Sequence, residues 1–249
     1  MTSYNKPQFV GRVIESILNQ TFTDFELFLM DDNSNEETQK VIKTYLQDTR
    51  IKYFRSGVKS VSERTNSIRY AVLINKALDM AAGKYITYAT DDNIYRPERL
   101  YKMVNYLDNK PEVQIVYCAC NNIVIDERGR IIKNSVLKAN SITWVAPCIT
   151  DHCTVMHRKS ILPVIYEKWG SYWDENPEFY LIGDARFFWR LNHFWPFYPL
   201  NVVLNDNYIT EQSLHYQLYT GGDEDNFAAM LPPQRTCKEL RDYLRSRMS

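Results

Sequence analysis

An apolar strand that runs directly into two aspartates decides the fold: residues 84–93 read KYITYATDDN. An earlier segment has the same form, since residues 25–34 read FELFLMDDNS. Each segment predicts a short buried strand followed by a polar loop. Helical patterns occupy residues 7–19 and 61–82, one ahead of each segment. This alternation of helix and strand predicts an α/β fold with a mostly parallel central sheet flanked by helices.

The pattern changes after about residue 120, where it predicts a smaller region of mixed structure. Turn residues and short apolar runs replace the regular alternation there. We see no linker and no repeat, so we expect one domain. The expected elements are a hairpin over 122–132, extended chain over 144–157, a helix over 185–193, a polar loop over 218–227 and a final helix over 234–247.

Composition excludes several classes of protein. The 30 basic and 30 acidic residues cancel, which argues against a nucleic-acid partner. No apolar run approaches the roughly 20 residues of a membrane span. Only 8 of the 249 residues are glycine, and no three of them fit a glycine-rich phosphate loop. If the protein binds a nucleotide, it does so without such a loop.

The cysteines and the first residues carry expectations of their own. The five cysteines lack metal-site spacing, and no signal peptide is evident, so we expect reduced thiols in a cytoplasmic protein. Residues 2–5 (TSYN) look like the polar loop that follows a first strand, yet only Met1 precedes them. Either the sheet lacks a central strand, or the sequence begins inside it.

Three polar loops are expected to converge. They are residues 2–5, 31–34 and 91–93, and ligands of such sheets bind at the carboxyl ends of the strands. Clustered carboxylates repel one another unless a cation compensates. A divalent metal that holds a diphosphate would do so, because Mg²⁺ and Mn²⁺ prefer oxygen ligands.

Each candidate has an ordinary structural alternative. Asp91 and Asp92 could divide contact with a ribose and a metal between them, or lie in a solvated loop. Asp32 could accept hydrogen bonds from a base or ribose, or cap the next helix. Arg64 and Arg69 could neutralise a diphosphate, or lie on a solvated helix face.

Further candidates lie in the second half. Asp184 precedes an aromatic-rich helix and could be a general base, although Asp also caps helices well. Asp151 could line an acceptor side. A soft-metal set of His152, Cys153 and His157 is disfavoured, since residues 152 and 157 point to opposite faces of an extended chain. Cys153 as a nucleophile with His152 is similarly weak.

Together these motifs resemble a family 2 glycosyltransferase of the GT-A fold. The resemblance in the first hundred residues rests on TSYN, ILNQTFTDFEL, MDDNS and AAGKYITYATDDN. In the second half it narrows towards glycosyltransferases of spore coat polysaccharide synthesis, through APCITDHCTVMHR, GSYWDE, IGDARFFWR and LPPQR. The family implies inverting transfer of a sugar from a UDP- or dTDP-sugar donor to a glycan acceptor, with Mn²⁺ or Mg²⁺.

The resemblance also assigns residues on the donor side. Matched motif by motif, it implies that Thr2 and Tyr4 lie in the nucleotide loop and that Asp32 contacts the base. It places Arg64 near the nucleotide and Asp91 against the ribose. The donor would thus be held by carboxylates, a metal and an arginine.

For the chemistry, the resemblance implies Asp92 as the metal ligand and Asp184 as the base, with Asp151 as a second acceptor-side candidate. One domain over residues 1–249 would hold the nucleotide in residues 1–120 and the acceptor in residues 121–249. Two alternatives stay open. A sugar nucleotidyltransferase usually has a glycine-rich N-terminal loop, which is missing here, and a binding protein could keep the fold without turnover.

Overall fold

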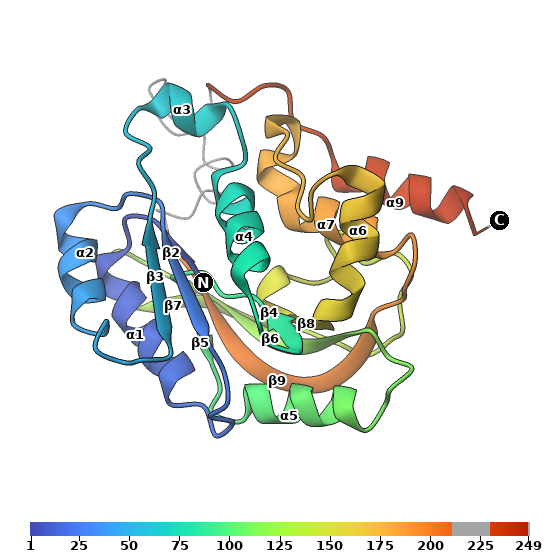
Figure 1. Cartoon of the computed structure of the whole chain (residues 1–249), viewed down its shortest axis with the longest axis horizontal. Coiled ribbons are helices and arrows are strands. Elements are labelled where there is room, and N and C mark those ends of the chain that lie inside the picture. The colour runs from blue at the N-terminus through green and yellow to red at the C-terminus, as the bar shows by residue number, and fades with distance from the viewer. Residues whose placement is uncertain (211–229, 249) are drawn as a thin grey trace.

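Two β-sheets that meet at one edge carry the chain's polar loops (Figure 1). The computed structural model describes residues 1–210 and 230–248. The expected polar loop over residues 218–227 lies outside the described residues. Among the described helices, none combines the length and the apolar character that crossing a membrane requires.

The first sheet is parallel, with the order β1 (Thr2–Ser3), β2 (Leu27–Asp31) and β3 (Ile51–Arg55). The expected loop over residues 2–5 is therefore partly wrong, because Thr2 and Ser3 form a strand. An isolated parallel bridge between Thr2 and Thr90 continues the pairing on the other side of β1. Thr2 N donates to Ala89 O over 3.1 Å, so β1 joins the two sheets.

Helices cover the first sheet as the sequence predicts. Helix α1 (Pro7–Leu18) buries an apolar face formed by Val10, Val13, Ile14 and Ile17. Helix α2 (Glu36–Lys43) begins at Asn35, whose side chain accepts a hydrogen bond from Thr38 N. These two helices pack on each other beside β1–β3 (Figure 1).

The long helix expected over residues 61–82 is broken into two. The structure has α3 (Val61–Thr65) and α4 (Arg69–Met80). Between them, Ile68 N donates to Glu175 O over 3.0 Å, and the Ile68 side chain is fully buried. This tertiary bond replaces the intrahelical one, so the chain turns, as Figure 1 shows for α3 and α4.

The second sheet is curled and mixed. Its order is β4-β8-β6-β9-β5, with β7 paired to β6. Strands β6 and β9 pair in parallel, whereas the other pairs are antiparallel. The strands are β4 (Tyr85–Thr87), β5 (Asn93–Tyr95), β6 (Ile115–Ile125), β7 (Ile131–Leu137), β8 (Val155–Arg158) and β9 (Tyr198–Ile209).

The remaining elements lie around this sheet, with α5 (Arg99–Asp108) beneath β9 in Figure 1. The predicted hairpin, the helix near 185–193 and the last helix are confirmed as β6–β7, α7 (Gly183–Leu191) and α9 (Cys237–Ser246). The other short elements are η1 (His152–Thr154), η2 (Lys159–Ile161), α6 (Leu162–Trp169) and η3 (Pro177–Ile182).

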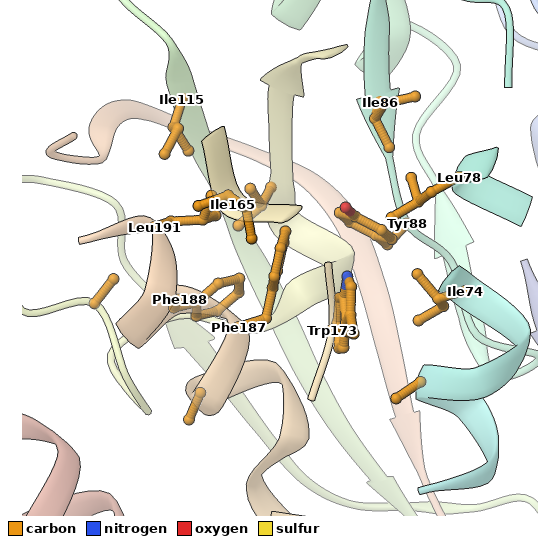
Figure 2. Close-up of a cluster of buried hydrophobic side chains, with 14 of the residues drawn as sticks. Ile74, Leu78, Ile86, Tyr88, Ile115, Ile165, Trp173, Phe187, Phe188 and Leu191 are labelled. Atoms are coloured by element: carbon orange, nitrogen blue, oxygen red, sulfur yellow. The ribbon is translucent and has the colours of Figure 1, made fainter. Parts of the chain in front are cut away.

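An aromatic core anchors α7 to the second sheet (Figure 2). Trp173 stacks on Phe187 with ring centroids 4.7 Å apart and an interplanar angle of 16°. Tyr88, which follows β4, meets Trp173 at 5.3 Å. Because both rings of the stack are fully buried, the first turn of α7 is fixed relative to the end of β4.

The expectation of five reduced cysteines is wrong for two of them. Cys148 and Cys237 form a disulfide, with Cα atoms 6.1 Å apart and a sequence separation of 89 residues. Cys118, Cys120 and Cys153 are free and buried. The bond ties the segment before η1 to the first residue of α9.

Candidate functional site

The three polar loops converge around Ser3, as the sequence predicts. Ser3 Oγ donates to Asp91 Oδ2 over 3.1 Å, and Tyr4 N donates to the same oxygen over 2.7 Å. On the other side of β1, Asp32 N donates to Ser3 O over 2.9 Å. The loops after β1, β2 and Thr90 therefore form one continuous polar surface.

Asp32 is held by both candidate arginines. Its carboxylate accepts hydrogen bonds from Arg64, from Arg69 over 2.8 Å and from Ser56 Oγ over 2.8 Å. Burial alone would raise the pKa of Asp32, but the hydrogen bonds from Arg69 and Ser56 lower it. The guanidinium of Arg64 also lies 4.0 Å from the ring centroid of Tyr4. The break between α3 and α4 lets both arginines reach Asp32.

Asp91 and Asp92 already hold a cation of the protein's own. Lys6 Nζ pairs with Asp92 Oδ2 and lies 3.5 Å from Asp91 Oδ1. Burial raises the pKa of Asp91 to about 6, while Lys6 acts in the opposite direction. Burial by itself would lower the pKa of Lys6, but its ion pairs with Asp91 and Asp92 raise it.

These contacts allow a test of the expected metal site. Asp91 and Asp92 supply the carboxylate oxygens that Mg²⁺ and Mn²⁺ prefer. The ammonium of Lys6 shows that the pair can accommodate positive charge at Asp92. The donor set therefore fits a divalent cation, on condition that Lys6 moves away from Asp92 or shares it.

Asp184 and Asp151 face one another across a histidine. Asp184 lies in the first turn of α7, and its Oδ2 is 3.7 Å from His152 Nδ1. Asp151 caps η1 by accepting a hydrogen bond from Cys153 N over 2.7 Å, and its Oδ1 is also 3.7 Å from His152 Nδ1. Burial would lower the pKa of His152, but Cys153 and the two carboxylates hold it well above the usual value.

Thr90 links this acidic group to the donor loops. Its hydroxyl donates to Asp92 Oδ1 over 2.7 Å and lies 3.7 Å from Cys153 Sγ. Cys153 is the neighbour of His152, which in turn approaches Asp184. The structure thus connects the expected side chains from Asp32 at one end to Asp184 at the other, and the last step is the 3.7 Å approach of His152 to Asp184. Thr2 lies beside them in β1.

Sequence reasoning missed Lys6, Thr90 and the role of His152 as a bridge. Lys6 follows the TSYN loop directly and is the first basic residue of the chain, so its position was the available signal. Thr90 immediately precedes the aspartate pair. Nothing in the local sequence indicates that His152 and Asp184, which are 32 positions apart, meet.

The expected extended chain over residues 144–157 is wrong in part, because His152 lies in the 3-10 helix η1 and only β8 is a strand. The argument from opposite faces against a set of His152, Cys153 and His157 therefore does not apply. His157 lies in β8, where its Nε2 is 2.7 Å from the Tyr88 hydroxyl, and it is fully buried. A different set exists, because ligating atoms of Asp151, His152 and Cys153 all lie within 4.8 Å of one another. Burial raises the pKa of the Cys153 thiol, which disfavours Cys153 as a nucleophile.

Comparison with known proteins adds an independent observation. A sequence model of the family described as "Glycosyl transferase family 2" matches residues 1–162. Protein CgeD of Bacillus subtilis is 47% identical over 213 residues, which are 86% of this chain and 50% of CgeD. The putative glycosyltransferase EpsE of the same organism is 32% identical over 163 residues, 64% of this chain and 55% of EpsE. The chain spans about half the length of these curated relatives.

Solved structures share the fold at low sequence identity. S. aureus TarS, crystallised with UDP, superposes with a TM-score of 0.63 at 15% identity, covering 99% of this chain and 70% of the TarS chain. The mannosyltransferase PcManGT from Pyrobaculum calidifontis, in complex with GDP-Man and Mn²⁺, superposes with a TM-score of 0.57 at 13% identity, covering 88% of this chain and 58% of the PcManGT chain. The fold is of the GT-A type that the sequence predicts.

Proposed function

The chain belongs to glycosyl transferase family 2, and from this premise we propose that it is an inverting, metal-dependent transferase. It moves a sugar from a UDP- or dTDP-sugar to a glycan acceptor. One observation carries the proposal: Asp32, Asp91 and Asp92 are joined by hydrogen bonds through Ser3 and by the ion pairs of Lys6, and Asp184 lies close to them. The connection runs from Asp92 through Thr90 and Cys153 to His152, whose Nδ1 is 3.7 Å from Asp184. A transferase needs a donor site and a base in such proximity.

We assign the donor to the surface around β1. Tyr4 is 43% exposed and is backed by Arg64, so its ring offers an aromatic face beside Asp32 for the base. Asp91 would bind the ribose, and Arg64 and Lys6 supply positive charge near the diphosphate. Thr2 would contribute to the donor site through its backbone, which pairs with β2 as part of β1. S. aureus TarS has been crystallised in complex with UDP and with UDP-GlcNAc, which supports a nucleotide-sugar donor.

The chemistry follows from Asp184. Its carboxylate accepts the proton of an acceptor hydroxyl, whose oxygen attacks the anomeric carbon opposite the diphosphate. The bond to the nucleoside diphosphate breaks in the same displacement, so the anomeric configuration inverts. Asp92 would hold a Mn²⁺ or Mg²⁺ ion, which would supply positive charge that stabilises the leaving diphosphate. Asp151 lies 3.7 Å from the same histidine as Asp184 and is proposed to line the acceptor side.

The finer assignments are proposals of the same kind. We place donor binding in residues 1–120 and acceptor binding in residues 121–249, within one domain. The resemblance of the second-half motifs supports a role in spore coat polysaccharide synthesis. A cytoplasmic location remains our prediction, although the Cys148–Cys237 disulfide argues for an oxidising compartment.

Calorimetry with UDP and dTDP, each with and without Mn²⁺, tests the donor site. We expect binding of at least one nucleotide to need the metal, and Asp92→Asn to abolish this dependence. Asp126→Asn is the matched control, because Asp126 pairs with Arg130 in the exposed β6–β7 turn. If neither nucleotide binds in a metal-dependent way, the proposal fails.

The base is tested separately, with a screen of nucleotide sugars and glycan acceptors read by release of nucleoside diphosphate. Asp184→Asn should keep nucleotide affinity and lose transfer by about 10²-fold or more. Full transfer by this variant would remove Asp184 from the role. Nucleotide binding without transfer by the wild type, with every donor tried, would favour the non-catalytic alternative.

A further inference from the structure

One buried nitrogen lies between the two acceptor-side carboxylates. Within the described part of the chain, His152 Nδ1 is a buried polar atom with no hydrogen-bond partner. It is 3.7 Å from Asp184 Oδ2 and 3.7 Å from Asp151 Oδ1. Both contacts are about 0.7–1 Å longer than a hydrogen bond, so a small movement of either carboxylate would complete one.

The packing of the imidazole fixes which way this nitrogen faces. The ring meets Trp173 edge-on, with centroids 5.9 Å apart and an interplanar angle of 83°. Trp173 in turn stacks on Phe187 of α7, the helix that carries Asp184 (Figure 2). The rigid aromatic core therefore holds the histidine and the first turn of α7 in register.

We propose that His152 is a positioning residue, whose Nδ1–H holds the Asp184 carboxylate in the orientation that receives the acceptor proton. The inference rests on the proposed function of Asp184. Hydrogen bonds of catalytic groups are often long without substrate and shorten when it binds. An unpaired buried donor is destabilising, so its retention beside the base indicates a use in the bound state.

The second carboxylate, that of Asp151, differs from Asp184 in how it is held. Asp151 Oδ1 is already held by Cys153 N over 2.7 Å, and Asp151 caps η1. It is thus anchored to the element that carries His152. Asp184 sits on a different element, so the contact between His152 and Asp184 joins η1 to α7. The other titratable groups near this contact are Cys153 and Tyr70, whose hydroxyl donates to Tyr180 O.

Two substitutions separate positioning from packing. His152→Phe keeps an aromatic ring against Trp173 and removes the donor. His152→Asn loses the ring but keeps an amide N–H close to the place of Nδ1. We expect His152→Phe to lower kcat by about 10²-fold with the KM for the nucleotide sugar changed less than about 2-fold. We expect His152→Asn to retain kcat within about 10-fold.

A purely structural role predicts the opposite order, with the Phe variant close to wild type and the Asn variant impaired and less stable. That result would overturn the inference. Thermal unfolding of both variants provides the stability comparison. In an Asp184→Asn background, His152→Phe should have no further effect on kcat, because the group that it positions is gone. Additive losses would contradict the inference.

Measuring the metal content of the purified protein tests one alternative, in which His152 is a metal ligand. Asp151, His152 and Cys153 offer donors that suit Zn²⁺. If the purified wild type holds one equivalent of zinc that His152→Phe loses, the histidine is a ligand and the inference fails. If the wild type transfers no sugar, the proposed function fails and the inference falls with it. Wild-type transfer that His152→Phe leaves unchanged would overturn the inference alone.

Discussion

The ammonium group of Lys6 is paired with the carboxylate of Asp92, the residue proposed to hold the metal. The same ammonium lies 3.5 Å from Asp91. A divalent cation at Asp92 must displace or share this charge. We therefore expect Lys6→Met to raise the affinity for Mn²⁺ by about 10-fold in the absence of nucleotide, because a competing cation has been removed. Electron paramagnetic resonance of free Mn²⁺ measures this affinity.

Lys6→Arg is the control for that experiment, since it keeps the positive charge and should bind Mn²⁺ about as weakly as the wild type. With UDP present, the Met variant should lose its advantage in Mn²⁺ affinity over the wild type, because Lys6→Met also removes a positive charge near the diphosphate. Equal Mn²⁺ affinity of the wild type and the Met variant without nucleotide would show that Lys6 does not compete with the metal.

The residue before the proposed base has no room for a side chain. A Cβ at Gly183 would lie 2.5 Å from the Tyr70 hydroxyl, which accepts a hydrogen bond from Gly183 N over 3.1 Å. Gly183→Ala should therefore lower the free energy of unfolding by about 1–3 kcal/mol and reduce transfer by shifting Asp184. Urea unfolding and kcat measure the two effects. Tyr70→Phe in the same background removes the oxygen and should return part of both. No recovery in the double variant would place the damage elsewhere.

His157 should make stability depend on pH. It is fully buried beside Tyr88, and burial lowers its pKa to about 4 from the ordinary 6.5. Below about pH 6.5, His157 binds a proton in the unfolded chain, whereas in the folded chain it stays neutral until the pH approaches 4. The contribution to stability is therefore complete above pH 6.5 and is lost as the pH falls towards 4, by up to about 1.4 kcal/mol per pH unit.

Urea unfolding at pH 8, 6.5 and 5 measures this dependence. His157→Gln cannot titrate but keeps polar atoms near the Tyr88 hydroxyl, so its free energy of unfolding should fall less between pH 6.5 and 5 than that of the wild type. Parallel curves for the two proteins would mean that His157 is not held neutral in the folded state.

The disulfide should contribute measurably to stability. Cys148 and Cys237 close a separation of 89 residues, and bonds of this kind stabilise by about 2–4 kcal/mol, mainly by restricting the unfolded chain. Dithiothreitol should lower the wild-type free energy of unfolding by that amount. The double variant Cys148→Ser with Cys237→Ser should be insensitive to it. Alkylation of all five cysteines in unfolded protein that was never reduced would disprove the bond.

Much of the fold was predictable because local pattern determines it. The buried face of α1 repeats with helical spacing, and β2 is a continuous apolar run, so both follow from periodicity. The break between α3 and α4 was not predictable, because it depends on a bond between Ile68 and Glu175 that are over a hundred positions apart. The Cys148–Cys237 pair was missed for the same reason.

In the candidate site, too, the features set by local sequence were predictable and those set by tertiary contacts were not. Asp91 and Asp92 follow the apolar run that contains β4, so their placement near the sheet edge could be inferred from the sequence. The contact of Lys6 with both of them depends on β1 lying beside Thr90, which no local pattern shows. The meeting of His152 with Asp184 depends on how η1 packs on α7, and only the three-dimensional structure supplies that.

The two-residue strand β1 has a consequence for selectivity. Ser3 accepts a hydrogen bond from the backbone N of Asp32 through its carbonyl oxygen and donates to the Asp91 carboxylate through its hydroxyl, so it sets the spacing between the two loops that carry these carboxylates. In the proposed donor site, one carboxylate meets the base and the other the ribose. A nucleotide whose base and ribose are a different distance apart would then bind poorly, because this spacing is fixed. No repulsive side chain would be needed to exclude it.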